Sequence, residues 1–217
     1  MMRFPVSRVS GRHVIGGLLS ITVLLLSGCL HSPVIEKTRY YAVTPAIKVN
    51  PVPSSGLTLG IRPLFVSHTY GPVMAYLDDN HQLGYRSGEE WAESPAYVVT
   101  RAIQDALAAS RRFADVGNAA DMARPDLLLT GELRIYRENR TVEPPTAELE
   151  IRLELRKATE PGSLWAETIT ESEPMKDDSP NALAESMTVI LGRFAERVSS
   201  SITAVPFLVP EAAPAEN

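Results

Sequence analysis

Cys29 has the most distinctive chemistry in the sequence. It is the only cysteine among 217 residues, so it can form no disulfide within the chain. A thiol can act as a nucleophile that takes up another group, and the alternative is a buried, inert side chain. Leu26, Ser27 and Gly28 precede it, and the small side chains leave the backbone open to a peptidase. This order of residues favours a modified cysteine at a processing site.

The other reactive side chains form no recognisable site. The sequence has no GxSxG, HExxH, Walker or GxGxxG motif. His31, His68 and His81 are not spaced as metal ligands with one another or with a cysteine, so we expect no metal site. Adjacent acidic pairs such as Asp78-Asp79 suit turns better than acid–base catalysis. We therefore expect a protein without catalytic residues or a cofactor.

The segment before Cys29 has the pattern of a secretory signal peptide. It is basic through Arg3, Arg8 and Arg12, and its apolar run covers 14–26. Such a run spans about 20 Å as a helix, whereas the hydrocarbon core of a membrane is roughly 30 Å thick. The sequence from Leu26 to Cys29 resembles the lipobox of bacterial lipoproteins. We predict a cleaved signal peptide over 1–28 and acyl chains such as palmitate on Cys29, which anchor the chain stably when two or more are present.

The charge and the residue after the cysteine indicate where the chain is anchored. Removing the three arginines of the signal peptide from the 21 basic residues leaves 18 against 26 acidic ones, a net charge of -8. An acidic body repels anionic headgroups and offers no basic face to nucleic acid, so the lipid must supply the attachment. Leu30 follows the cysteine where inner-membrane lipoproteins commonly have Asp. We expect a lipid-anchored protein of the outer membrane that faces the periplasm.

Aromatic residues gather in the stretch 70–91, where they could form a partner interface. Tyr and Trp are enriched at interfaces because they combine apolar area with a polar tip. They can also be ordinary core or half-buried strand residues, and the pattern alone slightly favours this second interpretation. The candidate interface comprises Tyr70, Tyr76, Leu77, Tyr85, Arg86 and Trp91.

Apolar periodicity predicts the strands that would position these residues. After a tether over 29–37, the predicted strands are 38–43, 57–61, 73–77, 82–86, 113–116, 126–136, 147–156 and 164–171. Those at 73–77 and 82–86 form a hairpin. In the strand at 147–156 apolar residues occupy every second position, so one face is dry and the other is wet. In the strand at 126–136 we expect Leu133 and Ile135 on one side.

Two Ser-Pro pairs predict the starts of two amphipathic helices, at Ser94-Pro95 and Ser179-Pro180. The first ends near Arg111-Arg112, where cations suit the negative end of the helix dipole. The second reaches Ile202, and its apolar stripe should pack on the sheet. From Pro206 a Pro- and Ala-rich tail, 206–217, is expected to be disordered. The elements predict a single-domain α+β two-layer sandwich over 38–205, with two helices on one face of a mixed or antiparallel sheet.

Five short motifs of this domain together resemble a known family. They are Tyr40-Tyr41, Ile61-Arg62-Pro63, Tyr76-Leu77-Asp78, Tyr85-Arg86 and Trp91-Ala92-Glu93-Ser94-Pro95. The family is the ABC-type transport auxiliary lipoproteins, the PqiC-like component of MCE lipid-transport systems. The resemblance implies a non-catalytic outer-membrane subunit that docks an MCE-domain protein and its ABC permease and ATPase, and it allows a homo-oligomer.

Two other functions fit the same features. One is an envelope-assembly or pilot-type structural lipoprotein, and the other is a periplasmic carrier that binds lipid between helix and sheet. A carrier needs an internal apolar cavity, whereas an adaptor is solidly packed. About ten residues join Cys29 to the domain and reach at most about 35 Å, which favours a docking platform near its membrane over a free shuttle.

Overall fold

The computed structural model describes residues 37–208. The signal peptide with Leu26, Ser27 and Gly28, the lipidation site Cys29, most of the tether and residues 209–217 lie outside the described range, so their assignments stay predictions. Within the chain, a unit of dense internal contacts begins at Thr38.

The described residues contain nine strands that belong to one mixed sheet. They are β1 (Arg39–Tyr41), β2 (Thr58–Ile61), β3 (Phe65–Val66), β4 (Val73–Leu77), β5 (Leu83–Trp91), β6 (Asp115–Asn118), β7 (Leu127–Asn139), β8 (Thr146–Lys157) and β9 (Ser163–Pro174). The helices are α2 (Pro95–Ala109), α3 (Pro180–Thr203) and the short 3-10 helices η2 (His68–Tyr70) and η3 (Pro206–Leu208).

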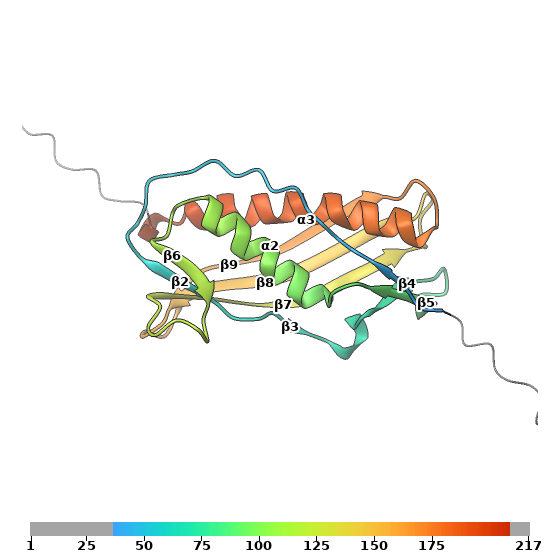
Figure 1. Cartoon of the computed structure of the whole chain (residues 1–217), viewed down its shortest axis with the longest axis horizontal. Coiled ribbons are helices and arrows are strands. Elements are labelled where there is room, and N and C mark those ends of the chain that lie inside the picture. Colours follow the sequence, from blue (N-terminus) through green and yellow to red (C-terminus); the bar gives the residue numbers. More distant parts are fainter. Residues whose placement is uncertain (1–36, 209–217) are drawn as a thin grey trace, which may run out of the picture. The chain divides into compact units, whose positions relative to one another are not determined.

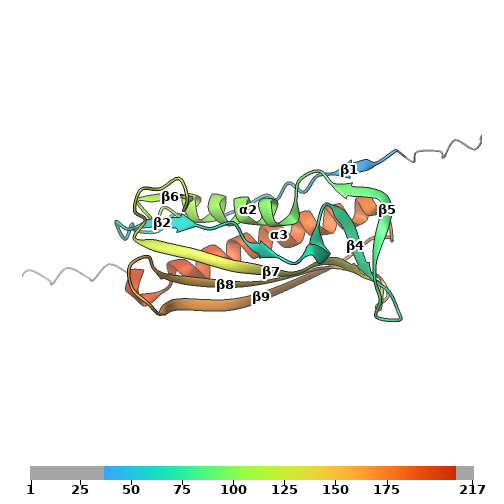
Figure 2. The ribbon, with the colours of Figure 1, turned by 90° about the horizontal axis from the view of Figure 1, so that it is seen from below.

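Strand β7 is the centre of the sheet. On one side β8 pairs with it antiparallel and β9 pairs antiparallel with β8. On its other side β2, β3 and β4 pair with it in succession, all parallel. Beyond β2 lies β6, and beyond β4 lie β5 and β1. Both long helices cover the same face (Figures 1 and 2). The predicted α+β fold with two helices on a mixed sheet is thereby confirmed.

A β-bulge changes the alternation of β7. The register with β8 shifts between Leu133 and Ile135, so that Leu133 lies opposite Ile151 and Ile135 lies opposite Glu150. The prediction that Leu133 and Ile135 share one side is therefore wrong, because a bulge inserts one extra residue and reverses the alternation beyond it. As a result, the side chain of Glu138 near the end of β7 is fully buried.

Both helices begin where the Ser-Pro pairs predict and end within about two residues of the predicted positions, but the predicted role of Arg112 differs. The Ser179 hydroxyl accepts a hydrogen bond from the Ala182 N–H at 3.1 Å and caps α3. Arg111 has a φ of 54° and follows the last turn of α2. The next residue, Arg112, is buried and donates to the carbonyl of Thr203 at 2.9 Å, which places this cation at the end of α3 rather than at the end of α2.

The hydrophobic core fills the space between the helices and the sheet. Phe194, Leu59 and Ile151 are among its fully buried side chains. A further layer is the crossing segment, residues 42–57, which connects β1 to β2 and passes over α3 (Figure 1). Gly192 permits this, because a Cβ there would lie 2.9 Å from the Ala46 carbonyl oxygen.

Several elements extend beyond their predicted limits. Strand β5 continues to Trp91, and β3 and η2 were not predicted at all, because they are too short to show a period. The tail was expected to be disordered from Pro206, yet Pro206–Leu208 form a 3-10 turn in which Leu208 is buried. Arg112 also donates to the Leu208 carbonyl, which ties this turn to the core. No helix in residues 37–208 is long and apolar enough to cross a membrane.

Candidate partner interface

The six candidate interface residues lie on or beside the β4–β5 hairpin, but they do not form one exposed surface. Tyr85 is the most exposed of them, with 49% of its surface accessible, and its hydroxyl donates to the Thr69 carbonyl at 3.2 Å. Tyr70 and Trp91 are buried. Whether a partner contacts this hairpin stays a prediction, and Tyr85 is the member best placed for it.

Trp91 is a core residue. Its ring meets the ring of Tyr136 edge to face, with centroids 5.1 Å apart and an interplanar angle of 76°. Such edge-to-face pairs are favourable beyond the area that they bury. Burial raises the pKa of the Tyr136 hydroxyl far above its usual value. Trp91 therefore joins β5 to β7 inside the domain.

Tyr76 is engaged within the hairpin. It lies opposite Gly84 on β5, and a Cβ at Gly84 would come within 2.4 Å of the tyrosine ring, so only a glycine leaves room for it. The guanidinium of Arg140 lies over the same ring at 3.8 Å from its centroid. This is a close cation–π contact. Tyr76 thus connects both hairpin strands to the end of β7.

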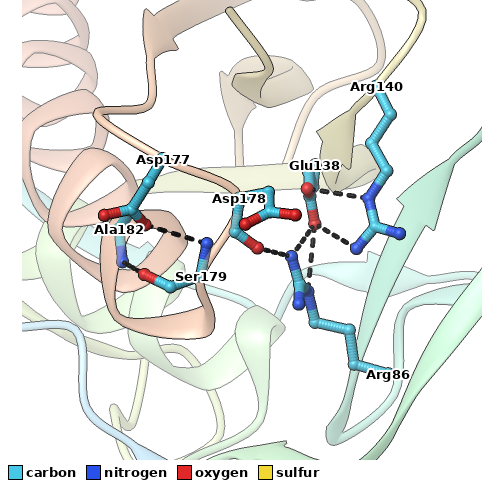
Figure 3. Close-up of polar contacts among 7 residues, drawn as sticks. All are labelled: Arg86, Glu138, Arg140, Asp177, Asp178, Ser179 and Ala182. Carbon is cyan, nitrogen blue, oxygen red and sulfur yellow. Dashed lines mark hydrogen bonds and ion pairs between the residues drawn. The ribbon is translucent and has the colours of Figure 1, made fainter.

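A buried carboxylate lies at the centre of this region (Figure 3). Arg86 donates to Glu138 Oε2 from Nε at 3.0 Å and from Nη2 at 2.7 Å. Arg140 donates to Oε1 at 2.8 Å and to Oε2 at 3.1 Å. The Glu138 side chain has no exposed surface, so both of its oxygens depend on these arginines. The hydrogen bonds to Glu138 raise the pKa of Arg140 above its usual value.

The Arg86–Glu138–Arg140 cluster also reaches the start of α3 (Figure 3). Arg86 donates to the backbone carbonyl of Asp178, and the preceding Asp177 accepts a hydrogen bond from the Ser179 N–H at 2.9 Å. The cluster therefore fixes β5, the end of β7 and the cap of α3 with respect to one another. Its groups satisfy each other, so it is suited to positioning these elements.

A second ion pair holds the first strand to the hairpin. Arg39 on β1 donates from Nε to the buried Glu89 on β5 at 3.1 Å, and its Nη2 contacts the other carboxylate oxygen. These hydrogen bonds lower the pKa of Glu89, although burial acts in the opposite direction. The hydrogen bond with Glu89 raises the pKa of the Tyr41 hydroxyl. The residues that directly follow the tether are thereby fastened to the sheet.

Three surface hollows accompany these elements. The first, of about 640 Å³, lies between residues 40–44 and the first half of α3, and its wall includes Tyr40 and Val189. The other two, of about 340 and 640 Å³, share Pro63 and Asn118 and follow the ends of β2 and β6. Among residues 37–208 no group of three or more His, Cys, Asp or Glu residues could hold a metal ion.

Sequence reasoning located the hairpin but missed the residues that stabilise it. Glu138 and Arg140 were not singled out, since an acidic residue near the end of a strand usually faces solvent. Only the bulge in β7 turns Glu138 inward, and nothing in the local spacing indicates that bulge. The hollows beside β2 and β6 were missed as well, because their lining combines residues from distant parts of the chain.

Comparisons with known proteins were consistent with this arrangement. Residues 41–199 match a family described as "ABC-type transport auxiliary lipoprotein component". A search of the curated proteins gives no significant sequence match.

Two solved structures share the fold. One is the crystal structure of protein XCC0632 from Xanthomonas campestris, with 18% identity, 74% of this chain and 92% of that chain covered, and a TM-score of 0.64. The other is the hypothetical protein CT253 from Chlamydia trachomatis, with 11% identity, 69% and 98% covered, and a TM-score of 0.50. At these identities the likeness concerns the fold alone.

Proposed function

This chain belongs to the ABC-type transport auxiliary lipoprotein family, and on that basis we propose that it is a non-catalytic docking subunit of an MCE-type lipid-transport system. In this role it is anchored in the outer membrane by lipid on Cys29 and faces the periplasm. Its partner is an MCE-domain protein that works with an ABC permease and ATPase to move phospholipid or other hydrophobic molecules. The subunit could act as a homo-oligomer.

The close packing of the domain interior is the main observation that supports a docking role. A carrier would need space for a hydrophobic molecule between the helices and the sheet. In this domain large side chains with essentially no exposed surface fill that space, including Phe194, Met74 and Ile103. The hollows described above open at the surface instead. A packed body with surface hollows favours an adaptor over a carrier.

The short connection to the proposed anchor supports the same role. Strand β1 begins at Arg39, and Arg39 itself donates a hydrogen bond to Glu89 on β5. Only a short segment of chain therefore separates Cys29 from the first residue that is held to the sheet. About ten extended residues reach at most about 35 Å. The domain would stay close to its own membrane, which suits a platform that receives a partner from across the periplasm.

Copurification from native membranes tests the proposal. Full-length tagged protein, extracted in mild detergent, should bring down the MCE-domain protein together with the permease and ATPase. The Cys29→Ser variant should appear in the soluble periplasmic fraction and recover less of the complex. Recovery of secretion or pilus components in place of transport components would support the envelope-assembly alternative. Stoichiometric lipid bound to the purified Cys29→Ser protein, which has no acyl chains of its own, would support the carrier.

A further inference from the structure

Strand β9 is a long, open edge of the sheet. It has 12 residues and pairs along its length with β8, but its other side pairs with no strand between residues 37 and 208 (Figure 2). The other strands that pair with only one neighbour, β1, β3 and β6, have two to four residues each. A long edge presents unpaired backbone donors and acceptors, so proteins either protect it or use it to pair with another chain.

Two hydrogen bonds show which backbone groups of β9 face outward. The N–H of Met175, one residue beyond the strand, donates to the Pro145 carbonyl at 2.7 Å and so points toward β8. Arg193 on α3 donates to the Ser172 carbonyl at 2.8 Å. In an antiparallel strand both backbone groups of a residue point to the same side, and the side alternates along the chain. The N–H and C=O groups that face outward therefore include those of Ala166, Thr168 and Thr170.

The protection of this edge is confined to its two ends. At one end Arg193 occupies the Ser172 carbonyl, and Pro174 beyond it has no N–H to donate. At the other end the register with β8 shifts between Leu155 and Arg156. The middle of the edge, from Ala166 to Thr170, has neither device. It is a short template on which a further strand can form.

The charges along β9 allow another copy of this acidic protein to approach. The mature chain has a net charge of -8, so two copies repel each other in general. On β9, however, Glu167 is paired with Arg197 at 2.7 Å. Glu171 and Glu173 are both paired with Arg193, at 3.3 and 2.5 Å. The outward-facing residues between them are uncharged and exposed. Two β9 strands therefore meet without bringing unpaired carboxylates together.

The partner that matches this edge is the same edge of a second copy. A lipid surface has no row of donors and acceptors in register with a strand, so the partner must itself be a strand with an open side. In the described chain only β9 offers such a strand, because the other open strands are too short. An isologous pair also satisfies the edges of both copies at once.

The blocked end of the edge determines the register of this pair. An antiparallel pair that uses only the unblocked residues places Thr168 opposite Thr168 of the second copy, and Ala166 opposite Thr170. Each of these residue pairs exchanges both of its backbone hydrogen bonds. Cross-strand threonine pairs add to the stability. A shift toward Ser172 would require a carbonyl that Arg193 already occupies.

We infer that two copies of this protein pair antiparallel through β9, centred on Thr168, so that their sheets form one continuous sheet. The inference specifies the surface and the partner of the homo-oligomer in the proposed function, and it rests on that part of the proposal.

Cysteine crosslinking in native membranes tests the pairing and its register. Full-length protein with Thr168→Cys is oxidised with copper phenanthroline, and the matched variants carry Ala166→Cys or Ser172→Cys. Only the two Thr168 positions lie opposite each other, whereas like positions of the matched variants are about 13 Å or more apart, too far for a disulfide. We expect about tenfold more disulfide-linked dimer from Thr168→Cys than from either matched variant. The wild-type protein is the control for Cys29.

Two results of this experiment would overturn the inference. One is equal crosslinking from the three positions, or none from any of them. The other is a crosslink from Thr168→Cys to a protein of a different mass, because the edge would then be filled by a different partner.

A charge at the centre of the pair tests the same contact without a new thiol. Thr168→Lys places two ammonium groups opposite each other, whereas Thr159→Lys adds the same charge in the turn between β8 and β9. Both side chains are exposed, so the thermal midpoint should stay unchanged. By sedimentation of the full-length protein in mild detergent, we expect Thr168→Lys to raise the dimer dissociation constant about tenfold and Thr159→Lys to leave it unchanged. Equally tight dimers of both variants would contradict the inference.

A failure of this inference differs from a failure of the docking role. A wild-type protein that stays monomeric at every concentration would overturn the inference, while the docking role stands. A wild-type protein that forms the Thr168-centred dimer but recovers no transporter component would overturn the docking role alone.

Discussion

At the hairpin end of the sheet, Glu138, Tyr76 and Trp91 are engaged in contacts within the domain, whereas Tyr85 keeps 49% of its surface accessible. Glu138 is enclosed by Arg86 and Arg140, the Trp91 ring packs on Tyr136, and the Tyr76 ring lies against Gly84. At the β2–β6 end, small and apolar side chains face solvent beside Arg62, which has no ion-pair partner in the part of the chain that the structure describes. Charged and aromatic residues thus stabilise the hairpin end, whereas alanine, proline and methionine form much of the surface at the β2–β6 end.

The difference teaches where to look for a docking site in a small domain. Aromatic density can identify a rigid framework as well as an interface, because rings that bury large area stabilise either one. A buried carboxylate between two arginines has no remaining capacity for a ligand. An exposed tyrosine such as Tyr97, which is 57% accessible, retains that capacity, since its apolar surface is still in water.

The largest expected effect is the removal of the hairpin's buried aromatic residue. Trp91→Ala should lower the free energy of unfolding by about 4 kcal/mol, because it leaves a cavity against Tyr136. The matched substitution of an exposed aromatic residue, Tyr97→Ala in the first turn of α2, should change the free energy of unfolding by less than about 0.5 kcal/mol. Urea unfolding followed by circular dichroism measures both. Similar losses of unfolding free energy for the two variants would remove the contrast between the engaged and the exposed aromatic residues.

The next effect concerns the enclosed carboxylate. Glu138→Ala should lower the free energy of unfolding by about 3 kcal/mol, because two guanidinium groups in a partly buried setting lose their partner. The control is Glu148→Ala at the neighbouring position of β8, whose carboxylate is also bound by an arginine but has 21% of its side-chain surface exposed, compared with 0% for Glu138. We expect the control to lose clearly less. A Glu138 variant as stable as the wild type would show that the cluster does not hold the hairpin.

A smaller effect should appear as a pH dependence from Glu89. Its pKa in the folded protein is lowered by Arg39, so the ion pair stabilises the fold above the usual glutamate pKa of about 4.3. This stability is lost as the pH falls through the lower, folded-state pKa, because protonation of the Glu89 carboxylate removes the ion pair. The stability difference between wild type and Glu89→Gln should therefore be constant near pH 7 and shrink below about pH 4. A difference that grows on acidification contradicts this assignment.

The smallest effect is expected at the ion pair between Glu93 and Arg101 at the start of α2. Glu93 and Arg101 are both well exposed, and such pairs add little to stability although their geometry is good. Glu93→Gln should leave the urea midpoint unchanged within error. A marked loss of stability would mean that exposed ion pairs, as well as the buried cluster around Glu138, hold this domain together.

Much of the fold could be predicted because its signals are local. The Ser-Pro pairs define the starts of α2 and α3, and the alternation in β8 defines a strand with one buried face. The bulge in β7 could not be predicted, since it depends on the register with β8. The pairing of Arg86 with Glu138 joins residues 52 positions apart, and no spacing rule connects them. For the candidate site, the sequence identified the hairpin residues but not their burial.

The crossing segment has a consequence for the order in which this protein matures. Residues 42–57 belong to the earliest-made part of the mature chain, yet they rest on the last helix: the Lys48 N–H donates to Glu196, 148 positions later. Closing so large a loop requires α3 to be available, and α3 ends at Thr203 of 217 residues. The crossing segment can therefore reach its native packing only after α3 has been synthesised. If the chain is exported as proposed, translocation of α3 precedes the completion of native folding.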